Sequence, residues 1–336
     1  MNSISRDARN SSIELLRIIC MLFVVAGHVV VFGIKPNWQA QGIGGGTDYV
    51  ICHSLYGLFV TAVDVFVLIS GWFSIKFNWR KIKNIWLMLI TYSWFFFAYK
   101  AASGGVNCKN ISYLLPVLSR QFWFVSVYFI LCFLSPALNK LVDGLSKKEL
   151  RNLLVVLVSV TYVWATISYF LNFPQIIPDF GGGIVNFVTL YLVSRYLRLY
   201  VVKLPSISKL VGCLLFIQVC ALCVQLVCSR ILGFPFTVLE NDNSLSTFLS
   251  SICILLIFVK IRFHSRLVNA CAGYVLAVYI LHMNDVAWPW LARFFSMSSF
   301  HGLGIVILCI YAPIAVFAVG SLIEFIRINI FRLFSK

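Results

Sequence analysis

Charged residues are scarce in this 336-residue sequence, and acidic residues are the scarcest. Asp, Glu, Lys and Arg make up 11% of the chain, against roughly 25% in soluble proteins, whereas apolar residues make up 61%. A soluble fold of this length cannot hide so much apolar surface from water, so lipid must solvate most of the chain. The composition therefore excludes a soluble enzyme and indicates a membrane protein.

Internal repeats, low-complexity tracts and long linkers are also missing from the sequence. Cys220 and Cys223 have Cys-x-x-Cys spacing, but no second pair or histidine cluster accompanies them, so we expect no metal. The long apolar stretches predict an all-α polytopic membrane protein, a bundle of about ten transmembrane helices that forms one domain over residues 1–336. The expected spans are 13–33, 49–74, 84–102, 121–139, 152–172, 183–200, 208–231, 244–261, 268–291 and 302–326.

Basic residues outnumber acidic ones by 27 to 11, and their positions alternate with the predicted spans. Of these 27, 21 fall at the N-terminus, in the first turn of the first span, in alternate loops on the same side or at the C-terminus. Because positive residues mark the cytoplasmic side, both termini are predicted to be cytoplasmic and the number of spans to be even. The positive charge is thus a topology signal, and nucleic-acid binding is not expected.

A few ionisable residues lie inside the predicted spans, where a charge costs roughly 2.5–3.5 kcal/mol on insertion scales. Arg17 and His28 are eleven residues apart in the first span, which places them on one helical face about 16 Å apart. Arg17 lies near the cytoplasmic entrance, and His28 lies deep, near the predicted depth of Asp64 in the second span. His282 lies in the ninth span, with Asp285 three residues later and expected on the same face.

Structural roles are open alternatives for each of these residues. Arg17 can extend to lipid phosphate, and His28 can be a neutral hydrogen-bond partner between helices. Asp285 can simply hold His282, and Asp64 can belong to a structural pair. Topology alone can account for the basic residues of the predicted inner loops, among them Arg80, Lys81, Lys83, Arg195 and Arg198. At the start of the first span, Ser11 and Glu14 form a capping-box pattern.

Four stretches occur in a recognisable order: Ile13 to His28, with ten residues between Arg17 and His28; Val63 to Phe73, ending in Ser-Gly and aromatics; Phe122 to Asn139; and Gly273 to His282. Together they resemble the signatures of the acyltransferase 3 family of bacterial integral-membrane acyltransferases, over almost the whole chain. One departure follows the second span, where members commonly carry Arg-x-x-Arg. This chain has Arg80 followed by Lys81 and Lys83, and lysine lacks the bidentate fork of arginine.

The resemblance implies acyl transfer, usually of acetyl from acetyl-CoA, to a hydroxyl of a surface polysaccharide or its lipid-linked precursor at the bacterial inner membrane. Acyl-CoA is polyanionic, which suits an inner mouth bearing Arg17, Arg80, Lys81, Lys83, Arg195 and Arg198. A sugar hydroxyl is a very weak acid, so its attack on a thioester needs a general base, for which His28 is the candidate.

Other candidate roles follow from the same chemistry. Asp64 is the expected outlet for the proton, and Ser70 or Trp123 is a candidate donor to the thioester oxyanion. His282 is a further catalytic candidate, expected to be less critical than His28 because Asp285 offers it a structural partner.

Two other classes of protein fit the same composition. A proton-coupled secondary transporter or glycan flippase would use the intramembrane His and Asp residues as a proton relay, but the sequence lacks the inverted repeats that favour transport. A non-catalytic scaffold would leave the buried charges unexplained. We therefore predict a membrane O-acyltransferase whose partners are acyl-CoA, an envelope glycan or lipid-linked sugar, and membrane lipid.

Overall fold

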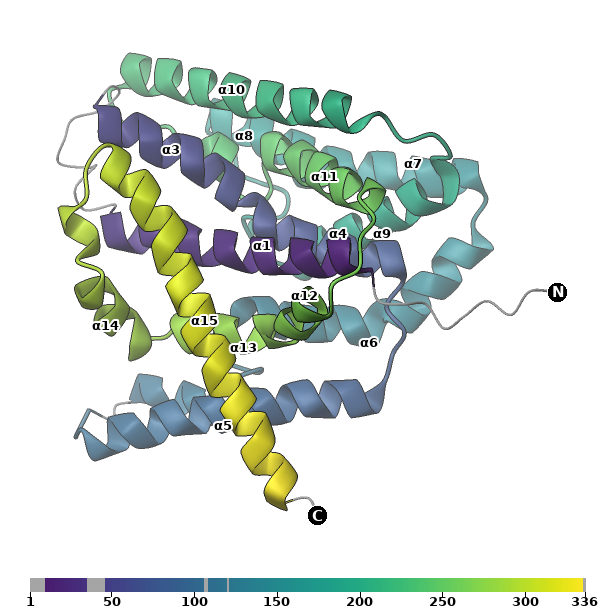
Figure 1. Ribbon diagram of the computed structural model, residues 1–336. Coiled ribbons are helices and arrows are strands. Elements are labelled where there is room, and N and C mark those ends of the chain that lie inside the picture. Colours follow the sequence, from purple (N-terminus) through teal and green to yellow (C-terminus); the bar gives the residue numbers. More distant parts are fainter. Residues whose placement is uncertain (1–9, 35–45, 106–107, 120, 335–336) are drawn as a thin grey trace.

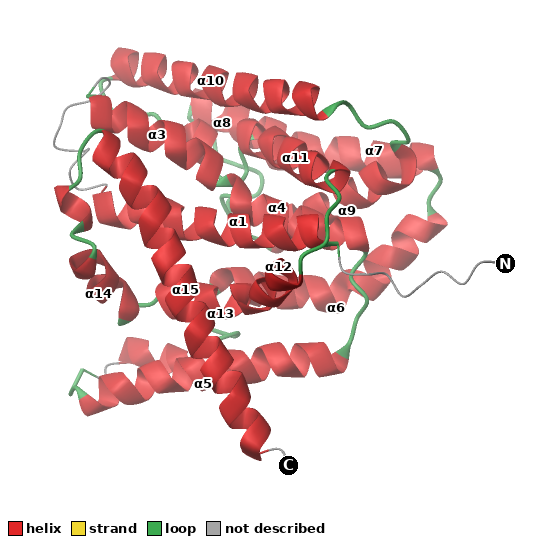
Figure 2. Cartoon of the chain, viewed as in Figure 1, coloured by secondary structure: helices red, strands yellow, loops and turns green. Residues whose placement is uncertain are grey.

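The computed structural model describes residues 10–34, 46–105, 108–119 and 121–334, and every regular element in these ranges is a helix (Figure 2). The chain crosses back and forth along one direction, and α15 slants across the other helices (Figure 1). The all-α prediction is therefore confirmed for the described part of the chain. Arg6, Arg9, Lys35, Arg120 and Lys336, which entered the topology argument, lie outside the described residues.

Fourteen α-helices make up most of the described residues. In chain order they are α1 (Ser11–His28), α3 (Thr47–Phe59), α4 (Thr61–Phe73), α5 (Trp79–Ala102), α6 (Trp123–Gly144), α7 (Lys147–Val158), α8 (Ala165–Leu171), α9 (Ile184–Tyr200), α10 (Ile207–Leu232), α11 (Leu245–Lys260), α12 (Arg266–Cys271), α13 (Val275–His282), α14 (Ala287–Phe294) and α15 (Leu303–Phe334). Two π-helical segments, Val29–Ile34 and Ser159–Trp164, continue α1 and α7, and short 3₁₀ turns cover Cys108–Leu114, Val238–Glu240, Ala272–Tyr274 and Met297–Ser299.

Eight helical stretches among the described residues are long and apolar enough to cross a membrane, and a bent pair makes a ninth if it is counted as one span. The predicted count of about ten is not confirmed. One difference is α9, which has 17 residues, fewer than the roughly 20 that a bilayer requires. The chain is nonetheless a multi-pass membrane protein, and the eight long stretches begin and end within seven residues of the predicted spans.

Residues 268–291 do not form the single unbroken helix that the prediction assumed, because the helix ends at His282 and the chain turns by 95° before α14. Asn284 explains the turn. Its side-chain oxygen accepts hydrogen bonds from the backbone N–H groups of Val286 and Ala287, at 3.0 and 2.8 Å, and so caps the start of the next helix. His282 therefore lies at the end of a helix, whereas in an unbroken helix it would lie in the middle.

One side of the bundle carries the starts of α1, α5, α7, α10 and α12, together with most lysines and arginines; we call it the basic side, toward the right in Figure 1. Each of these five helices begins with an Asn or Ser whose side chain accepts a backbone N–H of the first turn, which satisfies donors that lack a partner within the helix. At α1 the cap is Asn10, so the predicted Ser11 cap is wrong. Glu14 bonds Arg17 at 3.3 Å.

A close contact between α4 and α9 depends on Gly71. A Cβ at this position would lie 2.5 Å from the backbone oxygen of Tyr191 and 2.9 Å from its Cα. Small residues let helix backbones approach in this way, which is the main source of packing energy where lipid supplies no hydrophobic driving force. Ser194 adds a hydrogen bond from its hydroxyl to the carbonyl of Leu68, at 2.6 Å. Gly71 therefore fixes how α4, with its neighbouring Ser70, sits in the bundle.

We predict that Gly71→Ala destabilises the protein by about 1–3 kcal/mol, because the added methyl group forces the two backbones apart. The measurement is the thermal unfolding midpoint of the purified protein in detergent. Gly212→Ala on α10 is the matched control, since a Cβ there meets nothing within 4 Å. Equal midpoints for the two variants would contradict the packing argument.

Candidate active site

Two histidines from distant parts of the sequence meet in the middle of the bundle. His28 is the last residue of α1 and His282 the last of α13, and their rings stack with centroids 5.1 Å apart. His28 Nδ1 lies 2.9 Å from His282 Nε2, and His282 Nδ1 lies 2.8 Å from the backbone oxygen of Val278. His282 is 2% exposed, whereas His28 is half-buried.

These two hydrogen bonds determine where the protons of a neutral pair reside. The carbonyl of Val278 can only accept, so His282 Nδ1 carries the hydrogen and His282 Nε2 is left as an acceptor. His28 Nδ1 must then donate to it, which leaves His28 Nε2 with a free lone pair. A neutral imidazole with an unprotonated nitrogen is the form that a general base requires.

The helix geometry changes at His28. The α-helical pattern of α1 ends at this residue, and Val29–Ile34 continues as a π-helical segment. Such wide turns are rare and frequently mark functional sites, because the extra residue leaves backbone groups less regularly paired and shifts the side chains that follow. The ring of Phe32, within this segment, lies 5.6 Å from that of His28. The wide turn therefore sets the surroundings of His28.

A central cavity of about 310 Å³ contains both Arg17 and His28 in its lining, together with Ser70, Trp123 and Tyr128. Both α1 residues thus face one space, as their eleven-residue spacing requires. The guanidinium of Arg17 pairs with Glu14 at 3.3 Å, and its side chain is 37% exposed. Ser70 hydrogen-bonds the carbonyl of Phe66 at 3.0 Å and lies 3.1 Å from the Tyr128 hydroxyl.

A second cavity of about 350 Å³, the mouth cavity, lies where α4 leads into α5 on the basic side. It shares Arg17, Ser70, Ile85 and Tyr128 with the central cavity, so the two adjoin. Its lining also includes Lys76 and Lys81 but neither Arg80 nor Lys83, which are exposed.

The two arginines of α9 lie near the same end of the bundle. Arg198 stacks over Phe73, 5.3 Å from the ring centroid, and Phe73 lines the mouth cavity. Arg195 faces Asp143 at 4.0 Å.

A third space, which we call the far pocket, continues the series beyond His28. It measures about 170 Å³ and shares Val24, His28, Val63 and Trp123 with the central cavity. Its other lining residues include Phe32, Tyr56 and Asp242. His28 therefore stands between two spaces, one that leads toward the basic side and one that leads away from it.

A separate groove of about 710 Å³ lies between α5, α13, α14 and α15, and its lining is almost entirely apolar. His282 is part of this lining, along with exposed aromatic residues such as Phe95, Trp290 and Phe294. The far side of the histidine pair is thus surrounded by hydrocarbon side chains.

Asp64 lies on α4 with a different orientation from the cavity-lining residues of that helix. Val63, Phe66 and Ser70 line the central cavity, whereas Asp64 is fully buried and accepts a hydrogen bond from Asn186 at 3.4 Å. Its second oxygen has no hydrogen-bond partner among the described residues. A role for Asp64 as proton outlet stays a prediction.

Asp285 does not hold His282, contrary to the expectation from an unbroken helix. Its carboxylate accepts hydrogen bonds from Lys100, at the end of α5, and from the hydroxyl of Tyr113. The turn after His282 redirects Asp285, and the partners of His282 are the Val278 carbonyl and His28. The reason for ranking His282 below His28 is thereby removed.

Comparison of the chain with protein families gives one match, to a family described as an acyltransferase domain, over residues 10–324. The chain belongs to the acyltransferase 3 family. Comparison with curated proteins and with solved structures gave no match. This acyltransferase therefore has its histidine pair, and the cavities on either side of it, within the matched region.

Sequence reasoning missed several residues of the candidate site. Lys76 and Tyr128 line the cavities, and Asp242 lines the far pocket beside His28. Lys76 had been assigned only to a loop, and Tyr128 was visible only as part of the fourth-span pattern. Asp242 falls in a predicted outer loop, where its acidic side chain gave no signal. Among the described residues, no three His, Cys, Asp or Glu side chains come together as metal ligands would.

We predict that His282→Ala lowers acyl transfer by about 10²-fold, because loss of its Nε2 acceptor frees the ring of His28 to rotate out of position. His282→Gln is the informative second variant, since its side-chain oxygen can replace Nε2 as the acceptor and should restore part of the rate. The measurement is release of free CoA thiol from acetyl-CoA by purified protein. A fully active His282→Ala protein would show that the pair is not needed.

Proposed function

We propose that this protein transfers an acyl group, in the first instance acetyl, from acyl-CoA to a hydroxyl of a cell-envelope glycan or its lipid-linked precursor in the bacterial inner membrane. The observation that carries the proposal is the series of three spaces that adjoin through shared lining residues, with His28 between the second and third. Such a series lets a donor and an acceptor reach one base from opposite directions.

The mouth cavity suits the coenzyme end of the donor. Lys76, Lys81 and Arg17 line it, and phosphate groups form their strongest hydrogen bonds with such cations. The central cavity beyond Arg17 is lined mainly by apolar and aromatic side chains, among which a pantetheine arm and an acyl group fit. The thioester would then lie near His28. Arg80, Lys83, Arg195 and Arg198 remain proposed contributors to the positive potential at this end.

The reaction step follows from the protonation state of the histidine pair. His28 Nε2 removes the proton of the sugar hydroxyl as the oxygen attacks the thioester carbonyl, and a tetrahedral intermediate forms. The C–S bond then breaks, and the departing CoA sulfur takes the proton from His28. Throughout, His28 Nδ1 donates to His282, which stabilises the transient imidazolium.

The oxyanion of the intermediate needs a hydrogen-bond donor. Ser70 already donates to the Phe66 carbonyl, so its hydrogen is engaged in this structure. Trp123 lines both the central cavity and the far pocket, which places it beside His28 on each side. Of the two candidates, Trp123 is therefore the better placed.

Transport is the alternative reading of a series of cavities. A proton-coupled transporter or flippase would also need a route through the bundle, but it would need no thioester chemistry. Membership of an acyltransferase family favours the enzyme. An assay of acetyl-CoA consumption in detergent solution distinguishes the two classes of protein. An enzyme still consumes acetyl-CoA there, whereas a transporter has no gradient to use.

His28→Ala should abolish acyl transfer, with a loss of about 10²–10⁴-fold or more, because no other group supplies the base. CoA thiol release from acetyl-CoA is the assay, with envelope glycan as the acceptor. His264→Ala provides a control for loss of an imidazole, since His264 is exposed in the connection between α11 and α12. Retention of a third of the parental activity by His28→Ala would rule out His28 as the base.

Replacement of the mouth cations should act on donor binding. Arg17→Gln and Lys81→Gln should each raise the KM for acetyl-CoA about tenfold with a smaller change in kcat, because phosphate contacts are equal in the ground and transition states. Lys203→Gln is the control, an exposed lysine on the same side of the bundle. If all three variants share the parental KM, these cations serve topology alone.

A further inference from the structure

The far pocket has a polarity opposite to that of the mouth cavity. Among its lining residues, Asp242 is the only carboxylate and no lysine or arginine is present. His28 apart, the remaining lining is aromatic and aliphatic, with Phe32, Tyr56 and Trp123 contributing rings. A carboxylate repels the phosphates of a CoA donor, so this pocket is unsuited to the donor and suited to a ligand with hydrogen-bond donors.

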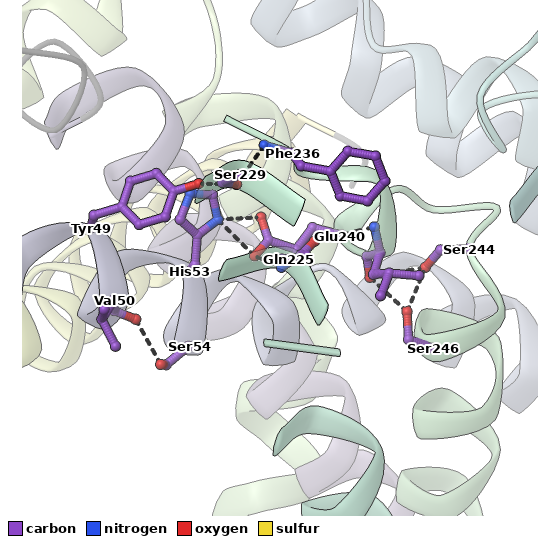
Figure 3. Close-up of polar contacts among 11 residues, drawn as sticks. Tyr49, Val50, His53, Ser54, Gln225, Ser229, Phe236, Glu240, Ser244 and Ser246 are labelled. Carbon is purple, nitrogen blue, oxygen red and sulfur yellow. Dashed lines mark hydrogen bonds and ion pairs between the residues drawn. The ribbon is translucent and has the colours of Figure 1, made fainter. Parts of the chain in front are cut away.

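Asp242 is held in place from the chain on both sides of it. Just before it, Glu240 accepts hydrogen bonds from His53 at 2.8 Å and from Gln225 at 2.9 Å (Figure 3). Just after it, Ser244 caps α11 by accepting the backbone N–H of Thr247. The segment that carries Asp242 is therefore fastened to α3, α10 and α11.

A second loop packs directly against Asp242. Gly181 adopts φ +87°, and a Cβ there would lie 2.7 Å from the Cβ of Asp242. The side chain of Asp179 accepts the Gly181 backbone N–H at 2.9 Å, which stabilises this turn. Glycine at 181 is thus required both by its backbone conformation and by the close approach.

The carboxylate of Asp242 itself has no hydrogen-bond or ion-pair partner among the described residues, although Glu240 and Ser244 on either side of it are held by hydrogen bonds. A half-buried carboxylate of this kind retains its full capacity to accept hydrogen bonds from a ligand. It stands in one pocket with His28, the candidate base. Preorganised acceptors of this type are the usual means of orienting a ligand in an otherwise apolar pocket.

We propose that the far pocket is the acceptor subsite, in which Asp242 accepts hydrogen bonds from the hydroxyls of a neutral sugar residue while the aromatic rings contact its C–H faces. This inference rests on the proposed function and names the class of acceptor. A neutral sugar supplies hydroxyl donors for Asp242 and directs another hydroxyl to His28 Nε2. An anionic sugar is disfavoured, because its carboxylate would face that of Asp242 at short range.

The test measures sugar binding and turnover separately. Ligand-observed NMR on the purified protein without acyl-CoA uses neutral methyl glycosides of glucose, galactose and N-acetylglucosamine, with methyl glucuronide as the anionic probe. We expect at least one neutral glycoside to bind, the glucuronide not to bind, and Asp242→Asn to weaken neutral binding about tenfold, the loss of one charge-assisted hydrogen bond. Asp242→Asn should also reduce the difference in binding affinity between the neutral glycosides and methyl glucuronide.

Two further proteins make the result decisive. Asp143→Asn, on the basic side, is the control for loss of a carboxylate, and Phe32→Leu removes a ring of the far pocket without touching Asp242. Unfolding midpoints near the parental value establish that each variant is folded. If no neutral glycoside binds, or if Asp242→Asn binds as tightly as the parent, the inference is overturned.

CoA thiol release with the same glycosides tests the proposed function independently. Glycoside binding that depends on Asp242, without His28-dependent thiol release, would contradict the proposed function and retain the sugar subsite. Thiol release that depends on His28, with a glycoside KM unaffected by Asp242→Asn, would retain the function and place the acceptor elsewhere.

Discussion

The hydrogen bond from His28 to His282 is the interaction on which the proposed chemistry of this molecule depends. It exists because the carbonyl of Val278 holds the hydrogen of His282 on Nδ1, which leaves His282 Nε2 as an acceptor. The backbone thus orients the ring of His282, and that ring orients the ring of His28. In water such a bond would contribute little, but in the low dielectric of a membrane interior it is stronger, and an unpaired imidazole would be costly. The high cost of an unpaired polar group in lipid therefore gives His28, the candidate base, a defined proton-accepting nitrogen.

The packing of α13 serves this arrangement. Val278, which provides the carbonyl, faces Gly320 of α15, where a Cβ would approach the Val278 side chain to 3.1 Å. On the other side, α4 is seated against α9 through Gly71, and its Ser70 lines the central cavity. Glycines thus allow the backbones that carry the site to approach closely, and the apolar residues around them supply the dispersion contacts. The fully buried pair His53–Glu240 acts at a distance, by holding the segment that ends in Asp242.

Hydropathy located the eight long membrane-crossing stretches, because long apolar runs have few alternatives to a helix in lipid. Hydropathy did not predict the break after His282. There the side chain of Asn284 ends one helix and starts the next, although the sequence around it remains apolar. Hydropathy also could not pair His28 with His282, since 254 residues separate them and only tertiary packing brings them together. Helical spacing did place Arg17 and His28 in one cavity, because both lie on a single regular helix. The position of Asp242 beside His28 could not be predicted from helical spacing, because Asp242 belongs to an irregular segment with no periodicity.

The distribution of helix caps has a consequence for how the protein meets membranes of different thickness. Side-chain caps fix the starts of α1, α5, α7, α10 and α12 on the basic side. On the other side, Ser244 caps α11 and Asn284 accepts backbone N–H groups at the start of α14, whereas α3, α6 and α9 have no side-chain hydrogen bond at the cap residue. Hydrophobic mismatch is absorbed where an element can shorten, tilt or shift with least cost. A thicker or thinner bilayer would thus be accommodated at the uncapped starts of α3, α6 and α9, while the basic side, with its five capped helix starts, stays in register with the lipid headgroups beside it.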